Sequence, residues 1–265
     1  MRFSNFHTHS VFSDGINTME EMVLAAIEKN FSAIGFSDHS TMTFNHSYCM
    51  KPDALHDYMR TIRELKDKYS EQIQVFAGLE LDYCSVRPDA DFDYIIGSVH
   101  CIPTPYGDHT SVDSSAPLQR AIVKKWFDGD MNWYAQVYYK TVMEMAKRFK
   151  PDIVGHFDVV CKFQELENPV YNGYALEAAA AVLEHCSLFE INTGAIARGY
   201  KSVAYPSPFL MRYLTDHGAK FILSSDCHNA LYLDCWFAEA LEYCRSFGVR
   251  SLVTLTGDGF TEYGI

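Results

Sequence analysis

Short, continuously apolar runs alternate along the chain with longer segments in which apolar residues recur every three or four positions. Runs of the first kind are typical of strands buried on both faces of a parallel sheet, and the second spacing is typical of amphipathic helices. Strands are predicted at residues 2–9, 33–39, 74–83, 94–102, 153–158, 188–193 and 220–228, and residues 251–255 could add a terminal one. Helices are predicted at residues 18–30, 52–70, 133–149, 174–186, 208–217 and 233–247.

This alternation predicts an α/β fold whose strands pair in parallel through right-handed helical crossovers. Seven such strands favour a closed or nearly closed barrel, with an open doubly wound sheet as the alternative. Polar residues stand at the C-terminal ends of nearly all the apolar runs, which is the rim where barrels place their chemistry. We therefore expect one barrel domain over residues 1–265, with residues 103–117 forming a loop over that rim and a candidate lid.

The composition narrows the possible functions. With 265 residues, 48% of them hydrophobic, the chain can bury one large core. Its 34 acidic and 22 basic residues give a net charge of -12, which is unfavourable for a protein that follows a nucleic-acid backbone. The same charge is compatible with a small anionic substrate if bound metal ions supply positive charge locally.

Eight cysteines are spread along the chain without any CxxC pair. This usage predicts reduced, mostly buried thiols of a cytoplasmic protein rather than a disulfide framework or a zinc module. The first residues do not show the charged-then-apolar pattern of a signal peptide, and no apolar run reaches about 18 residues. We expect neither a membrane nor a nucleic acid as a partner, and the oligomeric state stays open.

Histidines and carboxylates concentrate where the predicted strands end. His7 and His9 are two positions apart, so an extended chain directs both imidazoles to one side. Asp226 and His228 repeat this spacing near the end of the chain, with Cys227 between them expected to pack on the opposite side. The other polar residues at strand ends are Asp14, Asp38, His39, Glu80, His100, His156 and Asp158.

A single histidine at a strand end is more often structural than a metal ligand, but six of them with carboxylates are hard to attribute to coincidence. Nitrogen and oxygen ligands without thiolates suit zinc, manganese or iron. Because too many ligands converge for one ion, we expect two or three, with a carboxylate bridging. Asp38 and Asp158 are expected to orient imidazoles rather than to bind metal, and His46 and His109 are weaker candidates at the rim.

The ordered motifs resemble those of the PHP (polymerase and histidinol phosphatase) superfamily. The match runs from residue 3 to about residue 230 and rests on His7-Thr8-His9-Ser10 with Asp14, Ser37-Asp38-His39, Gly78-Leu79-Glu80, Gly97-Ser98-Val99-His100, Gly155-His156-Phe157-Asp158 and Ser225-Asp226-Cys227-His228. The strand Glu190-Ile191-Asn192-Thr193 and the turn Tyr205-Pro206-Ser207-Pro208 are similar to the stand-alone histidinol-phosphate phosphatase branch.

The resemblance implies a distorted (β/α)7 barrel with three metal ions at the C-terminal ends of its strands. Carried over by residue, it gives the first ion His7, His9, Glu80 and Asp226, the second Glu80, His100 and His156, and the third Asp14, His39 and His228. Glu80 would be the bridging carboxylate. The implied chemistry is hydrolysis of a phosphate monoester, for which metal ions neutralise charge and lower the pKa of bound water.

The implied substrate is L-histidinol phosphate, hydrolysed to L-histidinol and phosphate in histidine biosynthesis. Glu80, Asp226 and His228 would take part in catalysis, and Arg198 and Lys162 follow strands at the same rim, where they could bind phosphate. Asp158 or Glu165 could pair with the amine of the substrate. The alternatives are a related phosphoesterase acting on a nucleotide, sugar phosphate or phosphotyrosine, and a non-catalytic binding module; an exonuclease is disfavoured by the charge.

Overall fold

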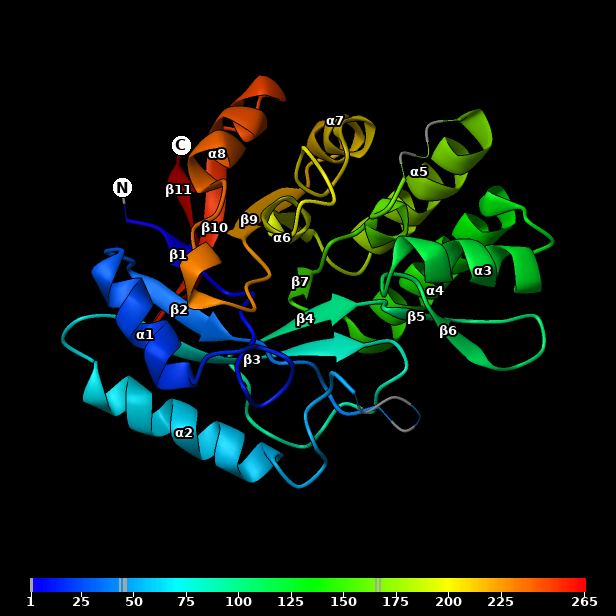
Figure 1. Cartoon of the computed structure of the whole chain (residues 1–265). Helices are drawn as coiled ribbons and strands as arrows, with labels where there is room; N and C mark the ends of the chain where they lie inside the picture. The colour runs from blue at the N-terminus through cyan, green and yellow to red at the C-terminus, as the bar shows by residue number, and fades with distance from the viewer. Residues whose placement is uncertain (1, 43, 45–46, 165, 167) are drawn as a thin grey trace.

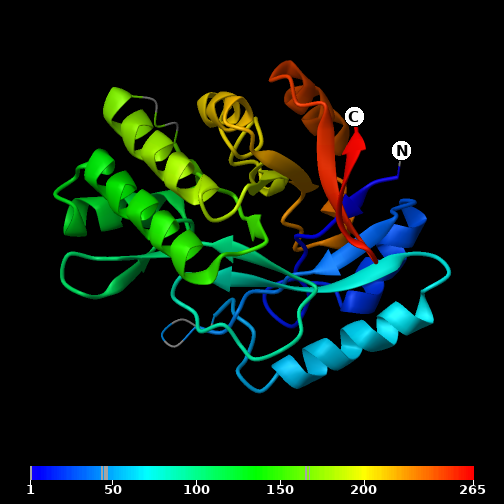
Figure 2. The same ribbon diagram turned by 180° about the vertical axis from the view of Figure 1, so that it is seen from behind.

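A curled sheet of parallel strands forms the centre of the computed structural model, which describes residues 2–42, 44, 47–164, 166 and 168–265. Seven strands of the described chain follow one another in sequence order and all pair in parallel. They are β1 (Ser4–Asn5), β2 (Ala33–Phe36), β3 (Gln74–Asp82), β4 (Tyr94–Ser98), β7 (Ile153–Val154), β8 (Leu188–Asn192) and β9 (Lys220–Ser224). Figures 1 and 2 show helices on the outside of this curl.

The last of these strands meets the first, so the sheet curls into a distorted barrel. Thr8, just beyond β1, forms a parallel bridge with Cys227, just beyond β9. The amide of His9 donates to the carbonyl of Cys227 at 2.8 Å, and the amide of Cys227 donates to the carbonyl of His7 at 3.1 Å. The predicted parallel α/β barrel is therefore confirmed, and its closure lies at the first and last histidine motifs.

The chain ends in an antiparallel addition to the barrel. The predicted strand near residue 251 is present as β10 (Ser251–Thr256), which pairs in parallel with β9 through Val253 and Ile222. A strand that the sequence pattern did not predict, β11 (Gly259–Gly264), pairs antiparallel with β10. The side chains of Ser4 and Thr254 lie 2.9 Å apart, so β10 also contacts the beginning of the chain.

Helices link the strands and cover the outer face of the barrel. The larger ones are α1 (Met19–Glu28), α2 (Leu55–Lys68), α3 (Ala116–Trp126), α4 (Met131–Phe149), α5 (Pro169–Leu183), α7 (Pro208–Asp216) and α8 (Phe237–Ser246). Their buried residues recur at helical spacing, as in α1, where Met19, Met22, Val23 and Ala26 face the core. Among the described residues, no helix is long and apolar enough to cross a membrane.

The segment predicted as a loop at residues 103–117 differs from the prediction. It contains a small hairpin, β5 (Cys101–Pro103) and β6 (His109–Ser111), and it ends in the first turn of α3. Ser115 caps that helix and Pro117 stands at its beginning, where a proline is tolerated because the first amides of a helix have no internal partner. The sequence pattern places Pro117 in a loop and does not predict α3.

Several predicted strands end earlier than expected, before the histidine motifs that follow them, as the first and the last barrel strands show. The regular pairing of β1 ends at Asn5, and that of β9 ends at Ser224. Asp226 adopts a left-handed conformation with φ +48°, so Asp226 and His228 are not carried by a straight strand. Cys227 is buried, as expected.

Candidate metal centre

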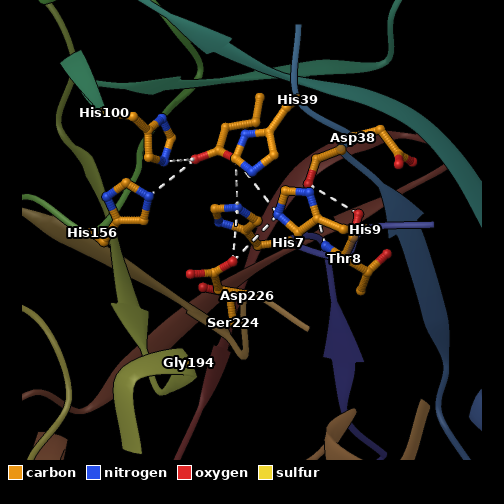
Figure 3. A network of polar contacts seen from close by, with 12 residues as sticks. His7, Thr8, His9, Asp38, His39, His100, His156, Gly194, Ser224 and Asp226 are labelled. Atoms are coloured by element: carbon orange, nitrogen blue, oxygen red, sulfur yellow. Dashed lines mark hydrogen bonds and ion pairs between the residues drawn. The ribbon is translucent and has the colours of Figure 1, made fainter. Parts of the chain in front are cut away.

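The nine predicted ligands lie together at the C-terminal ends of the barrel strands. Figure 3 shows the imidazoles of His7, His9, His39, His100 and His156 directed toward a common centre, with the carboxylate of Asp226 beside them. Most of these side chains are buried, and Asp14 at the outer edge is exposed. The ligand set is thus assembled from segments that are far apart in sequence, as the strand-end pattern predicted.

Glu80, at the end of β3, has imidazoles on both of its carboxylate oxygens. Oε1 lies 3.0 Å from Nε2 of His156 and 3.4 Å from Nε2 of His100. Oε2 lies 2.8 Å from Nδ1 of His39 and 3.2 Å from Nε2 of His7. A carboxylate whose two oxygens face two different sets of nitrogens has the position that a bridging ligand requires.

Asp226 faces the same ring nitrogens of His7 and His9 as Glu80 does. Its Oδ1 is 3.3 Å from Nε2 of His9 and 3.7 Å from Nε2 of His7. Gly194 makes room for this residue, because a Cβ at position 194 would lie 2.8 Å from the Cβ of Asp226. The bend at Asp226 therefore depends on close backbone approach by the turn that follows β8.

A tight turn and several hydrogen bonds fix the loop that carries Asp14. Gly15 allows a tight turn, since a Cβ there would lie 2.3 Å from the carbonyl oxygen of His9. Asp38 accepts hydrogen bonds from the amide and hydroxyl of Ser10 at 2.8 and 2.9 Å and from the hydroxyl of Ser13 at 2.6 Å. Our expectation that Asp38 orients an imidazole is wrong, because its hydrogen bonds hold this loop instead.

Asp158 also differs from the expectation. It accepts a hydrogen bond from the amide of Ser207 at 3.0 Å and so fastens the turn before α7 rather than an imidazole. His109 stacks on Phe44 with ring centroids 4.9 Å apart and does not line the central cavity. His46 and Glu165 lie outside the described residues.

Several buried atoms at the centre have no hydrogen-bond partner. They are Nε2 of His7, both ring nitrogens of His9, Nδ1 of His39 and Oε2 of Glu80. Buried polar atoms are rarely left without a partner, because such an atom loses its hydrogen bonds to water without replacement. These atoms are in close contact, as Nδ1 of His39 and Oε2 of Glu80 are at 2.8 Å, but their geometry is not that of a hydrogen bond. This is the arrangement expected of ligands directed at a shared cation. The residues present fit a metal centre.

Four groups of these residues place their ligand atoms within 4.8 Å of one another. Imidazole nitrogens and carboxylate oxygens in such groups could hold zinc, manganese or iron. The groups are His9, Asp14, His39 and His228; His7, Glu80 and His156; His7, His9 and Asp226; and His39, Glu80 and His100. Glu80 and the histidines of the first motif each belong to more than one group, so the sites adjoin.

The carboxylates around the candidate ligands favour positive charge at the centre of the cluster. Burial by itself would lower the pKa of His7, but the carboxylates of Glu190, Glu80 and Asp226 raise it well above the usual value. Burial would raise the pKa of Glu80, but the imidazoles around it lower it well below the usual value. Burial, helped by His228 and His39, lowers the pKa of His9 to about 3, so His9 is neutral at neutral pH, the form that binds metal.

Two further carboxylates contact the Nδ1 atoms of candidate ligands. The sequence analysis gave these carboxylates no role. Glu190 in β8 lies 2.6 Å from Nδ1 of His7, and Asp82 lies 3.2 Å from Nδ1 of His100. A partner on one ring nitrogen fixes the tautomer and turns the other nitrogen toward the metal. Signals for both were present: Glu190 is a charged residue within an apolar strand, and Asp82 is two positions after Glu80.

A cavity of about 330 Å³ opens beside the ligands. Arg198, which follows the short helix α6 (Gly194–Ala197), lines it and donates from Nη2 to Oδ2 of Asp226 at 2.8 Å. Lys162, after the turn η1 (Val159–Cys161), lines it as well and donates to Oδ2 of Asp113 at 3.1 Å. Both predicted phosphate-binding cations are therefore at the cavity, and each is paired with a carboxylate. The lining of the cavity also includes Tyr48, Ser111, Asp113, Ser114 and Tyr205.

Known proteins resemble this chain over nearly its full length. Residues 5–194 match the model of the PHP domain family. A Bacillus subtilis protein named "Histidinol-phosphatase" is 24% identical over 270 residues, covering 90% of this chain and 98% of the relative. A Deinococcus radiodurans protein named "Probable histidinol-phosphatase" is 27% identical over 260 residues, covering 94% of each.

Among solved structures, histidinol phosphate phosphatase from Lactococcus lactis, complexed with zinc, L-histidinol and phosphate, has a similar fold. The TM-score is 0.74 at 20% sequence identity, covering 98% of this chain and 99% of the other. At this identity the likeness concerns the fold. The fold and the family match agree with the ordered histidine motifs, and the chain belongs to the PHP domain family.

Proposed function

We propose that this chain is a metal-dependent phosphomonoesterase that hydrolyses L-histidinol phosphate to L-histidinol and phosphate. The observation that carries the proposal is the buried cluster of unpartnered imidazole and carboxylate atoms beside a cavity lined by Arg198. The names of the relatives and the zinc, L-histidinol and phosphate in the Lactococcus lactis structure support the choice of substrate.

The residues that would hold the metal ions are the nine at the strand ends. The first ion would take His7, His9, Glu80 and Asp226, the second Glu80, His100 and His156, and the third Asp14, His39 and His228. Two or three divalent ions, zinc, manganese or iron, would neutralise the phosphoryl charge and lower the pKa of bound water. The groups of ligand atoms within 4.8 Å support this division in part: one contains the whole third set, one contains His7, His9 and Asp226, and Glu80 is grouped with His156 and with His100 separately.

The cationic side chains would bind and orient the phosphoryl group. Arg198 has a planar guanidinium that can donate two parallel hydrogen bonds to phosphate oxygens, and Lys162 also lines the cavity and adds a second cationic side chain. The carboxylate of Asp226 keeps the guanidinium charged, because it raises the pKa of Arg198 against the effect of burial. Arg198 therefore stays positively charged opposite a phosphate dianion.

The leaving alkoxide needs a proton as the ester bond breaks. Asp226 and His228 are the protonatable residues beside Arg198, with Nδ1 of His228 3.2 Å from Nη1 of Arg198. We propose that His228 takes part in delivering that proton, while Asp226 takes part as the carboxylate that holds Arg198 and the metal. Glu80 orients the imidazoles around it. This division leaves Arg198 and Lys162 with substrate binding alone.

Residues 1–265 are proposed to form one domain, because one sheet connects β1 to β11 and one apolar cluster packs against it. The protein is proposed to work in the cytoplasm, and its eight cysteines, which form no disulfide in the described structure, fit that location. Its partner would be a small phosphorylated substrate rather than a nucleic acid.

A panel of phosphate monoesters tests the proposed substrate. Phosphate release is measured on the metal-loaded enzyme with L-histidinol phosphate, a sugar phosphate, a nucleoside monophosphate and phosphotyrosine. We expect kcat/KM for L-histidinol phosphate to exceed the others by about 100-fold, which corresponds to about 3 kcal/mol of transition-state discrimination. Equal activity on all of them would replace this substrate with the broader phosphoesterase alternative, and absence of activity would favour a binding module.

A further inference from the structure

Asp113 stands apart from the other acidic residues of the cavity. Three carboxylates line it among the described residues, and Asp14 and Asp226 belong to the groups that could hold metal. Asp113 belongs to none of these groups. A negative charge on the wall of a cavity that receives a phosphate dianion is unfavourable, so its presence calls for a positive charge to face it.

The position of Asp113 is fixed by the β5–β6 hairpin. The amide of the preceding residue, Val112, donates to the carbonyl of His100 at 2.9 Å, and Val112 itself is fully buried. The backbone of Asp113 is therefore held beside a predicted metal ligand, while its side chain stays partly exposed, at 23%, on the cavity wall.

Lys162 compensates part of this charge and is itself tightly held. Its Nζ donates to the backbone carbonyl of Asp113 at 2.9 Å and to Oδ2 of its carboxylate at 3.1 Å. The same ammonium faces the rings of Phe163 and Tyr200, 5.5 and 5.4 Å from their centroids. Within the described part of the chain, the contact of Asp113 Oδ1 is a long one, 3.4 Å from the hydroxyl of Ser111. A carboxylate accepts about four hydrogen bonds, so Asp113 retains acceptor capacity.

We propose that Asp113 recognises the leaving alcohol of the substrate by forming a salt bridge with its ammonium group. The inference rests on the proposed function, in which that alcohol is an amino alcohol. In a 2-amino phosphate ester the nitrogen is separated from phosphorus by one oxygen and two carbons, so the two charged groups lie close together. The phosphate then faces Arg198 while the ammonium faces Asp113, and the enzyme selects amino-alcohol phosphates over neutral esters.

The test compares two substrates that differ only in the amine. L-histidinol phosphate and the imidazolylpropyl phosphate that lacks the amine are hydrolysed by the metal-loaded wild type and by Asp113→Asn. We expect the wild type to prefer the amine by about 10- to 100-fold in kcat/KM, the range for one hydrogen bond between charged groups. Asp113→Asn should reduce this preference to near one while changing the rate on the amine-free ester little.

Lys162→Met is the matched control, because it removes the other half of the pair. This substitution should lower kcat/KM for both substrates by similar factors, since both carry the phosphoryl group. Equal losses on both substrates in Asp113→Asn would overturn the proposal and reduce Asp113 to a residue that holds Lys162. A wild type that does not distinguish the two substrates would overturn it as well.

A binding measurement separates this inference from the proposed substrate. The affinity of metal-loaded protein for L-histidinol and for the amine-free alcohol is measured by calorimetry in the presence of phosphate. The wild type should bind L-histidinol at least about 10-fold more tightly, and Asp113→Asn should not. If hydrolysis prefers another ester, the same comparison is made with ethanolamine and ethanol, and a preference for the amine that survives in Asp113→Asn would contradict the role of Asp113.

Discussion

At the scale of single residues, the centre depends on side chains that fix other side chains. Glu190 is fully buried and accepts hydrogen bonds from the amide of His156 at 2.9 Å and the hydroxyl of Ser224 at 2.8 Å. Its carboxylate also lies 2.6 Å from Nδ1 of His7. Glu190 thus determines which nitrogen of His7 faces the proposed metals, and it connects three segments in one network.

Replacing this carboxylate by an amide should weaken metal binding. Gln has the same shape as Glu, but it cannot compensate a proton on Nδ1 of His7, so Glu190→Gln is expected to lower metal affinity by about 10- to 100-fold. Competition with a chelator of known affinity measures the change. Glu239→Gln, at an exposed position of α8, is the control and should bind metal like the wild type; the same affinity in Glu190→Gln would refute this role.

At the scale of elements, helix α1 shows how local sequence positions the histidine motifs. The hydroxyl of Thr18 accepts from the amide of Glu21 at 3.2 Å, and the carboxylate of Glu21 accepts from the amide of Thr18 at 2.7 Å. This capping box begins the helix directly after the loop that carries Asp14. The helix then packs its apolar side onto the sheet.

Removing the cap should therefore reduce stability without removing ligands. Thr18→Ala is expected to lower the free energy of unfolding by about 1 kcal/mol, because the amide of Glu21 loses its partner. Thr18→Ser keeps the hydroxyl and should restore most of the loss. Urea unfolding of the three proteins measures the difference. A Thr18→Ala protein as stable as the wild type, or one that the serine does not rescue, would count against this account of the helix start.

The same elements show what the sequence could predict. Apolar runs located all seven barrel strands, and apolar residues at helical spacing located α1, because both patterns are local. The hairpin β5–β6 and helix α3 were missed, since strands of three residues are too short to show alternation and Pro117 was assigned to a loop. Strand ends were predicted too far along at Asp226, where the left-handed backbone is fixed by tertiary contacts rather than by propensity.

At the scale of the whole molecule, the barrel topology explains why the candidate ligands could be predicted at all. Parallel strands joined by right-handed crossovers carry all their C-terminal ends to one rim, so polar residues after successive strands must lie near one another. Glu190, Asp82 and Asp113 could not be ranked in the same way, because their roles depend on which side chain each faces. Those roles emerged only from distances across the barrel.

The central claim is that this rim holds metal ions that make the chain a phosphatase. The most direct measurement adds zinc or manganese to metal-depleted protein while bound metal and phosphate release from L-histidinol phosphate are followed together. We predict that activity rises with bound metal and levels at two or three ions per chain, and that Glu80→Ala binds fewer ions and loses at least about 100-fold in rate. Hydrolysis at the same rate without metal as with it, or full activity in Glu80→Ala, would contradict the account.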